Sequence, residues 1–285
     1  MTAITEVIKK RFSCRTYADR PIEEETLQKI TEIINSLPAG PFGGKPRLTL
    51  VNADSSSPQE WRKLGTYGVI RNARLFVVGA IKDTGNSLVD YGYCKELFIL
   101  RATQLGLGTC WLGGTFSSGS FARAIKLQNG ESLPTVAPIG YPALKKALAE
   151  KMMRGAAGSD KRKPWSELFF ADNFPTPLTP KQAGIYAEVL ENVRLAPSAA
   201  NKQPWRVIYD TQRNVFHFFL ARTFSYKLMG MSSLQDIDLG IAMSHFELTA
   251  REQGISGQWQ ISANAPEIRS LDYIVSWQEN GSVAS

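Results

Sequence analysis

The sequence has few of the residues on which most metal and nucleophilic sites depend. Its 285 residues include only three cysteines and two histidines. Cys14, Cys94 and Cys110 are widely spaced, which excludes a disulfide scaffold and a CxxC metal site. No apolar run reaches the roughly 18 residues that a membrane-spanning helix needs. The N-terminal residues lack the continuous apolar stretch of a secretory signal. We therefore expect a cytoplasmic protein.

Several catalytic motifs are also missing. The sequence contains no GxxxxGK[ST] phosphate loop, no HExxH zinc helix and no GxSxG nucleophile elbow. Gly106 and Gly108 form a GxG pair, but they follow a helical pattern and lack the third glycine of a dinucleotide fingerprint. His217 lies in a strand-like aromatic run and His245 in a helical one. We expect both histidines to be buried structural residues.

What the sequence does contain is an ordinary globular composition with an excess of positive charge. Hydrophobic residues make up 43% and charged residues 21%, which argues for a packed core and against disorder. The formal net charge of +7 suits nucleic acid, a membrane surface or an anionic small molecule. The basic residues form only short clusters, such as 9–11 and 161–163. We therefore favour an anionic small ligand over nucleic acid.

The chain also repeats a pattern. The windows 90–111 and 238–259 each open with Asp, carry Gly at the same later position and end with Trp. Apolar residues recur in both at helical spacing, and Gly106 and Gly254 stand where a helix C-cap is expected. Before each window come a helical pattern, a proline-containing loop and strand patterns, at 24–37, 47–51 and 76–78, then at 183–196, 206–209 and 216–220.

This order indicates an internal duplication. We expect an N-terminal half over residues 1–171, a proline-rich linker over 172–180 and a C-terminal half over 181–285. Duplicated halves commonly pack as a homodimer would, through a pseudo-twofold interface. We therefore expect one intertwined globular unit that is monomeric and mimics a dimer.

Two segments have the chemistry of anion or heterocycle binding. Arg11, Ser13 and Arg15 lie within five residues, and two guanidinium groups with a hydroxyl can bracket a phosphate. The loop 197–205 carries a hydroxyl, two amides and a Trp between prolines, and such amides can contact the edge of a polar heterocycle. Alternatively, the basic residues face solvent and the loop is an ordinary helix-to-strand connection.

Taken together, five motifs resemble the nitroreductase family of FMN-dependent oxidoreductases. They are RFSCRTY at 11–17, the helix ending in GLGTCWLGG at 114, GYP at 140–142, RKP at 162–164 and PSAANKQPWRV at 197–207. The resemblance is to a subgroup in which two halves are fused. It implies an α+β fold around a central, antiparallel-rich sheet, with NAD(P)H as electron donor and nitroaromatic or quinone-type acceptors.

The resemblance also implies which residues bind FMN. Arg11, Ser13 and Arg15 would hold the phosphate, with Arg162 and Lys161 adding charge. Leu112, Gly113 and Gly114 would lie beside the reactive edge of the ring, with backbone N–H groups available to it. No side chain is expected to be catalytic. The remaining cofactor-binding residues are Phe12, Pro197, Ser198, Asn201 and Gln203, and Tyr67 and Gly68 are expected to line the pocket.

The distribution of these motifs implies one FMN per chain. In the family each FMN lies at the dimer interface, and the intact proline loop lies here in the C-terminal half. The corresponding loop at 37–46 lacks the Ser and Asn. Three alternatives remain: a flavin-binding protein without turnover, a basic scaffold for nucleic acid or other anions that has lost the flavin, and a relative with other flavin chemistry, such as reductive dehalogenation or a flavin-consuming reaction.

Overall fold

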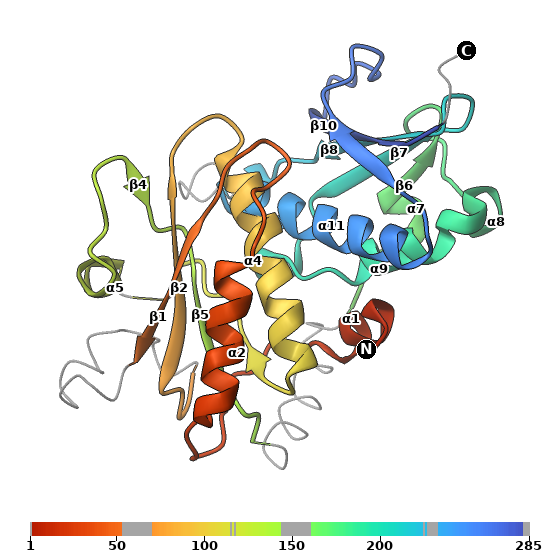
Figure 1. Ribbon diagram of the computed structural model, residues 1–285. Helices are drawn as coiled ribbons and strands as arrows, with labels where there is room; N and C mark the ends of the chain where they lie inside the picture. The colour runs from red at the N-terminus through yellow and green to blue at the C-terminus, as the bar shows by residue number, and fades with distance from the viewer. Residues whose placement is uncertain are drawn as a thin grey trace. The chain divides into compact units, whose positions relative to one another are not determined.

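The computed structural model describes residues 2–52, 70–114, 116, 118–143, 161–224, 226 and 233–281. Contacts divide the chain into two compact units. The N-terminal unit comprises Lys9–Asp160, and the C-terminal unit comprises Lys161–Ser285 together with Ala3–Ile8. Each unit is built on one sheet with helices packed against it (Figure 1). Tyr67 and Gly68, which the sequence places in the pocket, lie outside the described residues.

The sheet of the N-terminal unit is antiparallel and has the strand order β1-β2-β5-β3, with β4 paired to the end of β2. Strand β2 is buried along most of its length because helices cover both of its faces. The Tyr91 ring of α4 packs on Gly79 on one face, and Phe121 of α5 lies 5.3 Å from Phe76 on the other. The strands are β1 (Arg47–Asn52), β2 (Leu75–Lys82), β3 (Gly108–Thr109), β4 (Glu131–Ser132) and β5 (Val136–Gly140).

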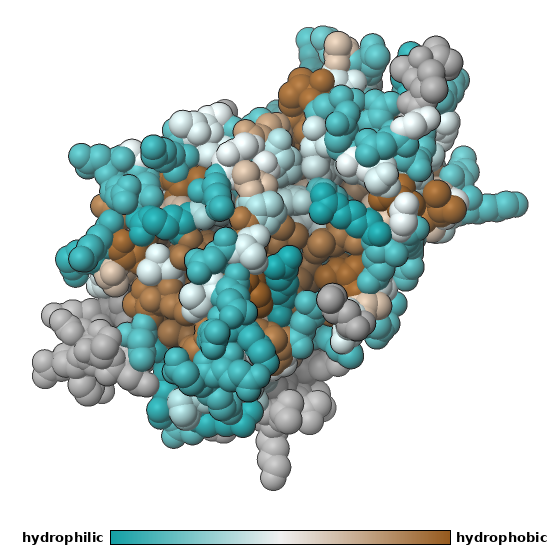
Figure 2. All heavy atoms as spheres, viewed as in Figure 1, coloured by the Kyte–Doolittle hydropathy of each residue, from teal (hydrophilic) through white to brown (hydrophobic). Residues whose placement is uncertain are grey.

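The described part of this unit has two helices that the sequence predicts, α2 and α4, and one that it does not, α5. Helix α2 (Glu24–Asn35) is amphipathic, and only Ile30 is fully buried. Hydrophilic side chains accordingly cover its outward side (Figure 2). Helix α4 (Ser87–Gln104) is buried along most of its length, and α5 (Ser118–Ala124) is a short helix that the sequence analysis did not predict.

The sheet of the C-terminal unit has the order β6-β7-β8-β10-β9. Its strands are β6 (Phe169–Ala171), β7 (Trp205–Asp210), β8 (Val215–Leu220), β9 (Gly257–Gln260) and β10 (Asp272–Glu279). Helix α11 covers one face, where Phe246 contacts Phe216 and Phe218. The helical segments are α1 (Ile4–Lys10), α7 (Trp165–Leu168), α8 (Pro180–Ala183), η2 (Gly184–Tyr186), α9 (Ala187–Leu195), η3 (Ala199–Asn201) and α11 (Ser233–Glu252).

The two units share a topology. The antiparallel order β1-β2-β5-β3 matches β7-β8-β10-β9, and the central helices α4 and α11 each connect the second strand to the fourth. Both helices end in the same cap, in which a glycine takes a positive φ, 77° at Gly106 and 78° at Gly254. The next residue, Leu107 or Ile255, donates its N–H back to the last turn. The predicted glycine caps are thus confirmed.

The contact division falls earlier than the boundary expected at 172–180. Residues 161–171 belong to the C-terminal unit because β6 pairs in parallel with β7. Residues 3–8 also belong there, since the Asn192 amide donates to the hydroxyls of Thr5 in α1 and Thr249 in α11. Strand pairing and a buried amide network therefore set the boundary between the units. The proline content of 172–180 gives no information about either interaction.

Both histidines are buried, as the sequence predicts. His217 Nδ1 lies 2.7 Å from Ser276 Oγ, and His245 Nδ1 lies 2.9 Å from the Asn192 carbonyl. Burial lowers the pKa of His217, which keeps the ring neutral. Among the described residues, none of the helices combines the length and the apolar character needed to cross a bilayer.

Candidate functional site

The segment after α1 is extended and carries the predicted phosphate residues on one face. Ser13 forms a parallel bridge with Thr109, and the Cys14 N–H donates to the Thr109 carbonyl at 2.8 Å. Side chains alternate in an extended chain, so Arg11, Ser13 and Arg15 share one side. Cys14 is buried on the other side. The three residues therefore lie in one segment that the Thr109 pairing holds in place.

Arg11 is the most buried member of this face. Its side chain is 6% exposed, its Nε lies 3.9 Å from Glu96 Oε1, and its buried Nη1 has no hydrogen-bond partner among the residues that the structure describes. An unmet guanidinium donor is costly to bury, and an anionic ligand would satisfy it. The side chain of Arg15 is half-buried and makes no ion pair among the residues that the structure describes. Two cationic groups are thus available on this face.

Glu96 connects Arg11 to the loop expected beside the flavin ring. Its carboxylate is fully buried and accepts a 2.8 Å hydrogen bond from Trp111 Nε1. Trp111 directly precedes Leu112, Gly113 and Gly114. One acidic side chain of α4 therefore contacts both parts of the predicted site in this unit. Sequence reasoning missed Glu96, although a Lys-Glu pair inside an apolar helix is an unusual pattern.

Lys95 is the other member of that pair and is also fully buried. Its Nζ donates to Tyr91 Oη at 3.1 Å and to the Thr135 carbonyl and hydroxyl at 3.0 and 2.8 Å. Burial lowers the pKa of Lys95 well below its ordinary value. The amine also lies 5.0 Å from the Trp111 ring centroid. Lys95 thus lies over the face of the Trp111 ring, and Glu96 accepts the hydrogen bond of its indole N–H.

The expectation for the Leu112 backbone is wrong. Its N–H donates to the Val136 carbonyl at 3.0 Å and its carbonyl accepts from the Val136 N–H, so this peptide has no donor left for a ligand. The side chain is buried in the core. Gly113 is half-buried and Gly114 is exposed, so the candidate N–H donors begin at Gly113. The pairing that consumes the Leu112 N–H comes from β5, which the sequence analysis did not predict.

The loop at 197–204 has a constrained backbone. Ala200, Asn201 and Gln203 all have a positive φ, between 45° and 55°. Residues other than glycine rarely adopt this backbone conformation. The Gln203 N–H donates to Ser198 Oγ at 2.8 Å, and the Ala199 N–H donates to Asp238 Oδ1 at 2.9 Å. Such strain persists where the surrounding structure holds the loop firmly, often at functional sites.

The amides of this loop bind the 161–163 segment. Asn201 Oδ1 accepts from Arg162 Nη1 at 3.0 Å, and Asn201 Nδ2 donates to the Lys161 carbonyl at 2.6 Å. Gln203 Oε1 accepts from the Lys163 N–H at 2.8 Å, and its Nε2 donates back to Asn201. Gln203 is only 2% exposed. Its amide therefore orders this loop and the Arg162 segment.

This network changes the grouping of the predicted residues. The sequence analysis assigned Lys161 and Arg162 to the N-terminal half, whereas the contact division places them in the C-terminal unit with the loop. Arg162 also donates from Nη2 to the Leu195 carbonyl at 3.1 Å, at the end of α9. Pro197 is half-buried between that helix and the loop. The N-terminal unit keeps Arg11, Phe12, Ser13, Arg15 and the 112–114 loop.

Two aspartates hold equivalent loops in the two units, but in different ways. Asp90 of α4 accepts from the N–H groups of Phe42 at 2.9 Å and Gly44 at 2.6 Å, one on each oxygen. Asp238 of α11 is buried and uses Oδ1, while its Oδ2 has no hydrogen-bond partner among the described residues. Burial raises the pKa of Asp238 well above its ordinary value. The sequence repeat identified both residues but not this difference.

Comparison with known proteins identifies the family. A family model described as "Putative TM nitroreductase" matches residues 3–250. A solved structure of a "putative nitroreductase" from Thermotoga maritima MSB8 is 22% identical, with a TM-score of 0.60 over 97% of this chain and 92% of that chain. The chain therefore shares that fold. No curated protein matches.

Two other solved structures match about half of the chain. An FMN-dependent nitroreductase from Clostridium difficile R20291 is 21% identical over 48% of this chain and 86% of that chain, with a TM-score of 0.40. A nitroreductase with bound FMN from Desulfitobacterium hafniense DCB-2 is 20% identical over 50% and 91%, with a TM-score of 0.39. The family match, by contrast, includes all of the N-terminal unit and most of the C-terminal one, and on that match the chain belongs to this nitroreductase family.

Proposed function

We propose that this protein is an FMN-dependent oxidoreductase that passes electrons from NAD(P)H to nitroaromatic or quinone-type acceptors. Family membership supports the reaction class. The observation that carries the cofactor proposal is the segment with Arg11, Ser13 and Arg15, where the buried Nη1 of Arg11 has no acceptor within the described part of the chain. The dianionic phosphate of FMN supplies acceptor oxygens and charge of the required sign.

The residues present fit this cofactor. Arg11 and Arg15 provide the charge, and the Thr109 pairing fixes the segment that carries them. When bound, FMN supplies the hydride and electron transfer, so the protein has to supply binding, orientation and electrostatics. This agrees with the absence from the sequence of the common nucleophile and metal motifs.

The roles of the protein groups follow from their contacts. Arg11 and Arg15 bind the phosphate, and Glu96 orients Arg11 and Trp111. The N–H groups of Gly113 and Gly114 are donors for the ring edge, because glycine permits close approach. In the C-terminal unit, Ser198 and the remaining N–H of Asn201 are ligand donors, and Gln203 holds the loop in place.

We further propose that the two units are diverged copies and that the chain binds one FMN. The shared strand order and the identical glycine caps support duplication. The phosphate-binding face occurs once, and the loop with Ser198 and Asn201 also occurs once. The corresponding loop of the N-terminal unit is a glycine turn held by Asp90. A single polypeptide with both copies is expected to be monomeric, which light scattering on a sizing column measures.

Phosphate recognition is tested by comparing FMN with riboflavin, which lacks the phosphate. The wild-type protein should bind FMN at least tenfold more tightly in a fluorescence titration. Arg15→Ala should remove most of this preference, since it deletes one charge-assisted contact of about 1.5–3 kcal/mol. Lys10→Ala removes an exposed neighbouring cation and serves as the matched control. Equal affinity of the wild-type protein for both flavins would contradict the assignment.

Turnover is tested by NADH and NADPH oxidation by the FMN-loaded protein, with and without a nitroaromatic or a quinone. Stimulated oxidation supports the proposal. Tight FMN binding without stimulation by any acceptor would indicate a flavin-binding protein without turnover. A protein that stays colourless after FMN is added would instead be the basic scaffold. Loss of the flavin itself during the assay would indicate a flavin-consuming relative.

A further inference from the structure

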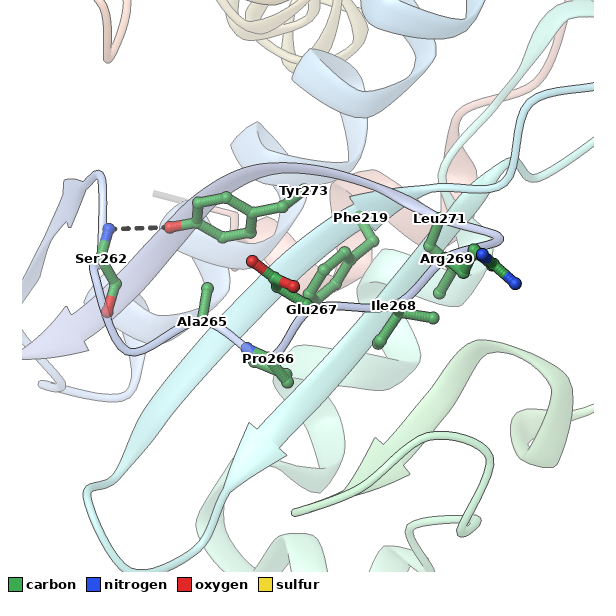
Figure 3. A pocket seen from close by; sticks show the side chains of 9 residues that line it. All are labelled: Phe219, Ser262, Ala265, Pro266, Glu267, Ile268, Arg269, Leu271 and Tyr273. Atoms are coloured by element: carbon green, nitrogen blue, oxygen red, sulfur yellow. Dashed lines mark hydrogen bonds between the residues drawn. The ribbon is translucent and has the colours of Figure 1, made fainter.

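The C-terminal unit has a pocket that shares no residue with the proposed flavin site. Its volume is about 490 Å³, and it lies under the segment 261–271 that joins β9 to β10 (Figure 3). Phe219 forms part of its wall, next in sequence to Phe218, which faces α11. Successive strand residues point to opposite faces, so the pocket lies on the face of the sheet turned away from α11. It is lined by Phe219, Ser262, Ala265, Pro266, Glu267, Ile268, Arg269, Leu271 and Tyr273.

The N-terminal unit indicates why space remains here. There the corresponding face of the sheet is covered by the longer connection 110–135, which includes α5, and Phe121 and Ile125 are buried against Phe76 and Val78. In the C-terminal unit the shorter segment 261–271 must cover the same face. It contributes the partly buried Ile268 and Leu271 to a small cluster around Phe219. The shorter segment leaves a hollow that both apolar and polar side chains line.

The aromatic wall of the hollow is rigid. The Tyr273 ring lies 5.4 Å from the Phe219 ring. Tyr273 Oη accepts from the Ser262 N–H at 2.9 Å and bonds Ser276 Oγ at 2.7 Å, and that hydroxyl also bonds the buried His217. This chain of hydrogen bonds fixes the Tyr273 ring before any ligand arrives, which reduces the entropic cost of binding.

The pocket has one acidic and one basic lining residue, and their side chains point in different directions. In Figure 3 the Glu267 carboxylate extends toward Tyr273 over the aromatic wall, whereas the Arg269 guanidinium points away from it. Neither side chain makes a hydrogen bond or an ion pair with another residue that the structure describes. An acidic group beside the accessible Tyr273 ring attracts an organic cation, through the ion pair and through the negative face of the ring.

We propose that this pocket binds a small protonated amine that carries an aromatic ring. The ring packs against Ile268 and Leu271, and the ammonium group pairs with Glu267 beside Tyr273. The volume lies in the range of small-molecule sites, about 300–1,000 Å³. The site requires no flavin, so it stands whether or not the proposed oxidoreductase activity is correct.

The test uses phenethylamine as the probe and 2-phenylethanol as its neutral analogue. Ligand-observed NMR titrations on the FMN-loaded protein should give an affinity about fivefold higher for the amine, the upper range for an exposed ion pair. Glu267→Gln should abolish this preference, and 1 M salt should reduce it. Arg269→Gln is the matched control and should keep the preference. Because Glu267 is exposed, neither substitution should impair folding.

The proposal would be overturned by equal affinities for the two probes, by an amine preference that survives in Glu267→Gln, or by no saturable binding at millimolar concentrations. A preference that disappears when FMN is added would place the amine in the flavin site and would also contradict it. Failure of FMN to bind would affect only the proposed function, since the titration can then be repeated without FMN.

Discussion

The two loop-binding aspartates should respond oppositely to the same substitution. Asp90 accepts one backbone N–H on each oxygen, from Phe42 and Gly44. Only a carboxylate offers two acceptor oxygens. Asp90→Asn keeps one of these bonds and turns an NH₂ group toward the other N–H. Loss of one charge-assisted hydrogen bond and the resulting donor-donor contact should cost about 3 kcal/mol.

Asp238 accepts only one hydrogen bond among the described residues, so it does not require two acceptor oxygens. Its Oδ1 binds the Ala199 N–H, while its buried Oδ2 meets no donor in the part of the chain that the structure describes. In Asp238→Asn the amide oxygen preserves the one bond, and the substitution removes a carboxyl group whose charge burial penalises. We expect stability within about 0.5 kcal/mol of wild type at pH 4, where the free carboxyl is about half protonated.

The difference should grow with pH. The folded-state pKa of Asp238 is raised, so above about pH 4 the unfolded chain loses a proton that the folded chain keeps. Wild-type stability then falls by up to about 1.4 kcal/mol per pH unit until the folded pKa is reached. Asp238→Asn removes this fall and should be stabilising at pH 7. The pKa of Asp90 is also raised by burial, but its two N–H donors oppose that rise.

Urea denaturation of wild type, Asp90→Asn and Asp238→Asn at pH 4, 5.5 and 7 measures both effects. The expected order at pH 7 is Asp238→Asn above wild type and Asp90→Asn below it. Equal destabilisation by the two substitutions would refute the reasoning. So would a stability of Asp238→Asn that follows the wild-type pH profile.

Three other predictions concern Lys95, the glycine turn at 43–44 and Trp111. Lys95→Met should raise stability at pH 7, because burial lowers the folded-state pKa of Lys95 and so penalises its charged form in the folded chain. Wild-type stability should rise toward pH 10 and that of Lys95→Met should not, as thermal melts would measure. Gly44→Ala should cost more than about 3 kcal/mol, since its Cβ would fall 2.6 Å from Asp90 Oδ2, whereas Gly43→Ala, with open space but a φ of +88°, should cost about 1–2 kcal/mol. Trp111→Phe removes the N–H bonded to Glu96 and should weaken FMN binding severalfold in a fluorescence titration, while Trp259→Phe should not.

Periodicity predicted the long elements because their apolar spacing follows the chain geometry. The strands at Arg47–Asn52 and Val215–Leu220 and the central helices all appear where the pattern indicates. The two central helices begin at Ser87 and Ser233, before the repeated Asp90 and Asp238. The repeated aspartates mark residues that contact a loop, and not the first residue of each helix. The short strand β5 carries too little pattern to be recognised.

The candidate site was predictable only in part. The grouping of Arg11, Ser13 and Arg15 can be predicted from their spacing alone, because alternate residues of an extended backbone point to the same side. The roles of Leu112 and Arg162 depend on partners distant in sequence, Val136 and Asn201, which no local pattern contains. Glu96 was missed for the same reason, because its function lies in contacts with Arg11 and Trp111.

The central claim is that this chain uses its single phosphate-binding face to hold one FMN. Titration of flavin-free protein with FMN, followed by flavin fluorescence at protein concentrations well above the dissociation constant, tests it most directly. The account predicts a break at one FMN per chain in the wild-type protein and a loss of the break in Arg11→Ala. A break at two FMN per chain, or no binding by the wild-type protein, would contradict it.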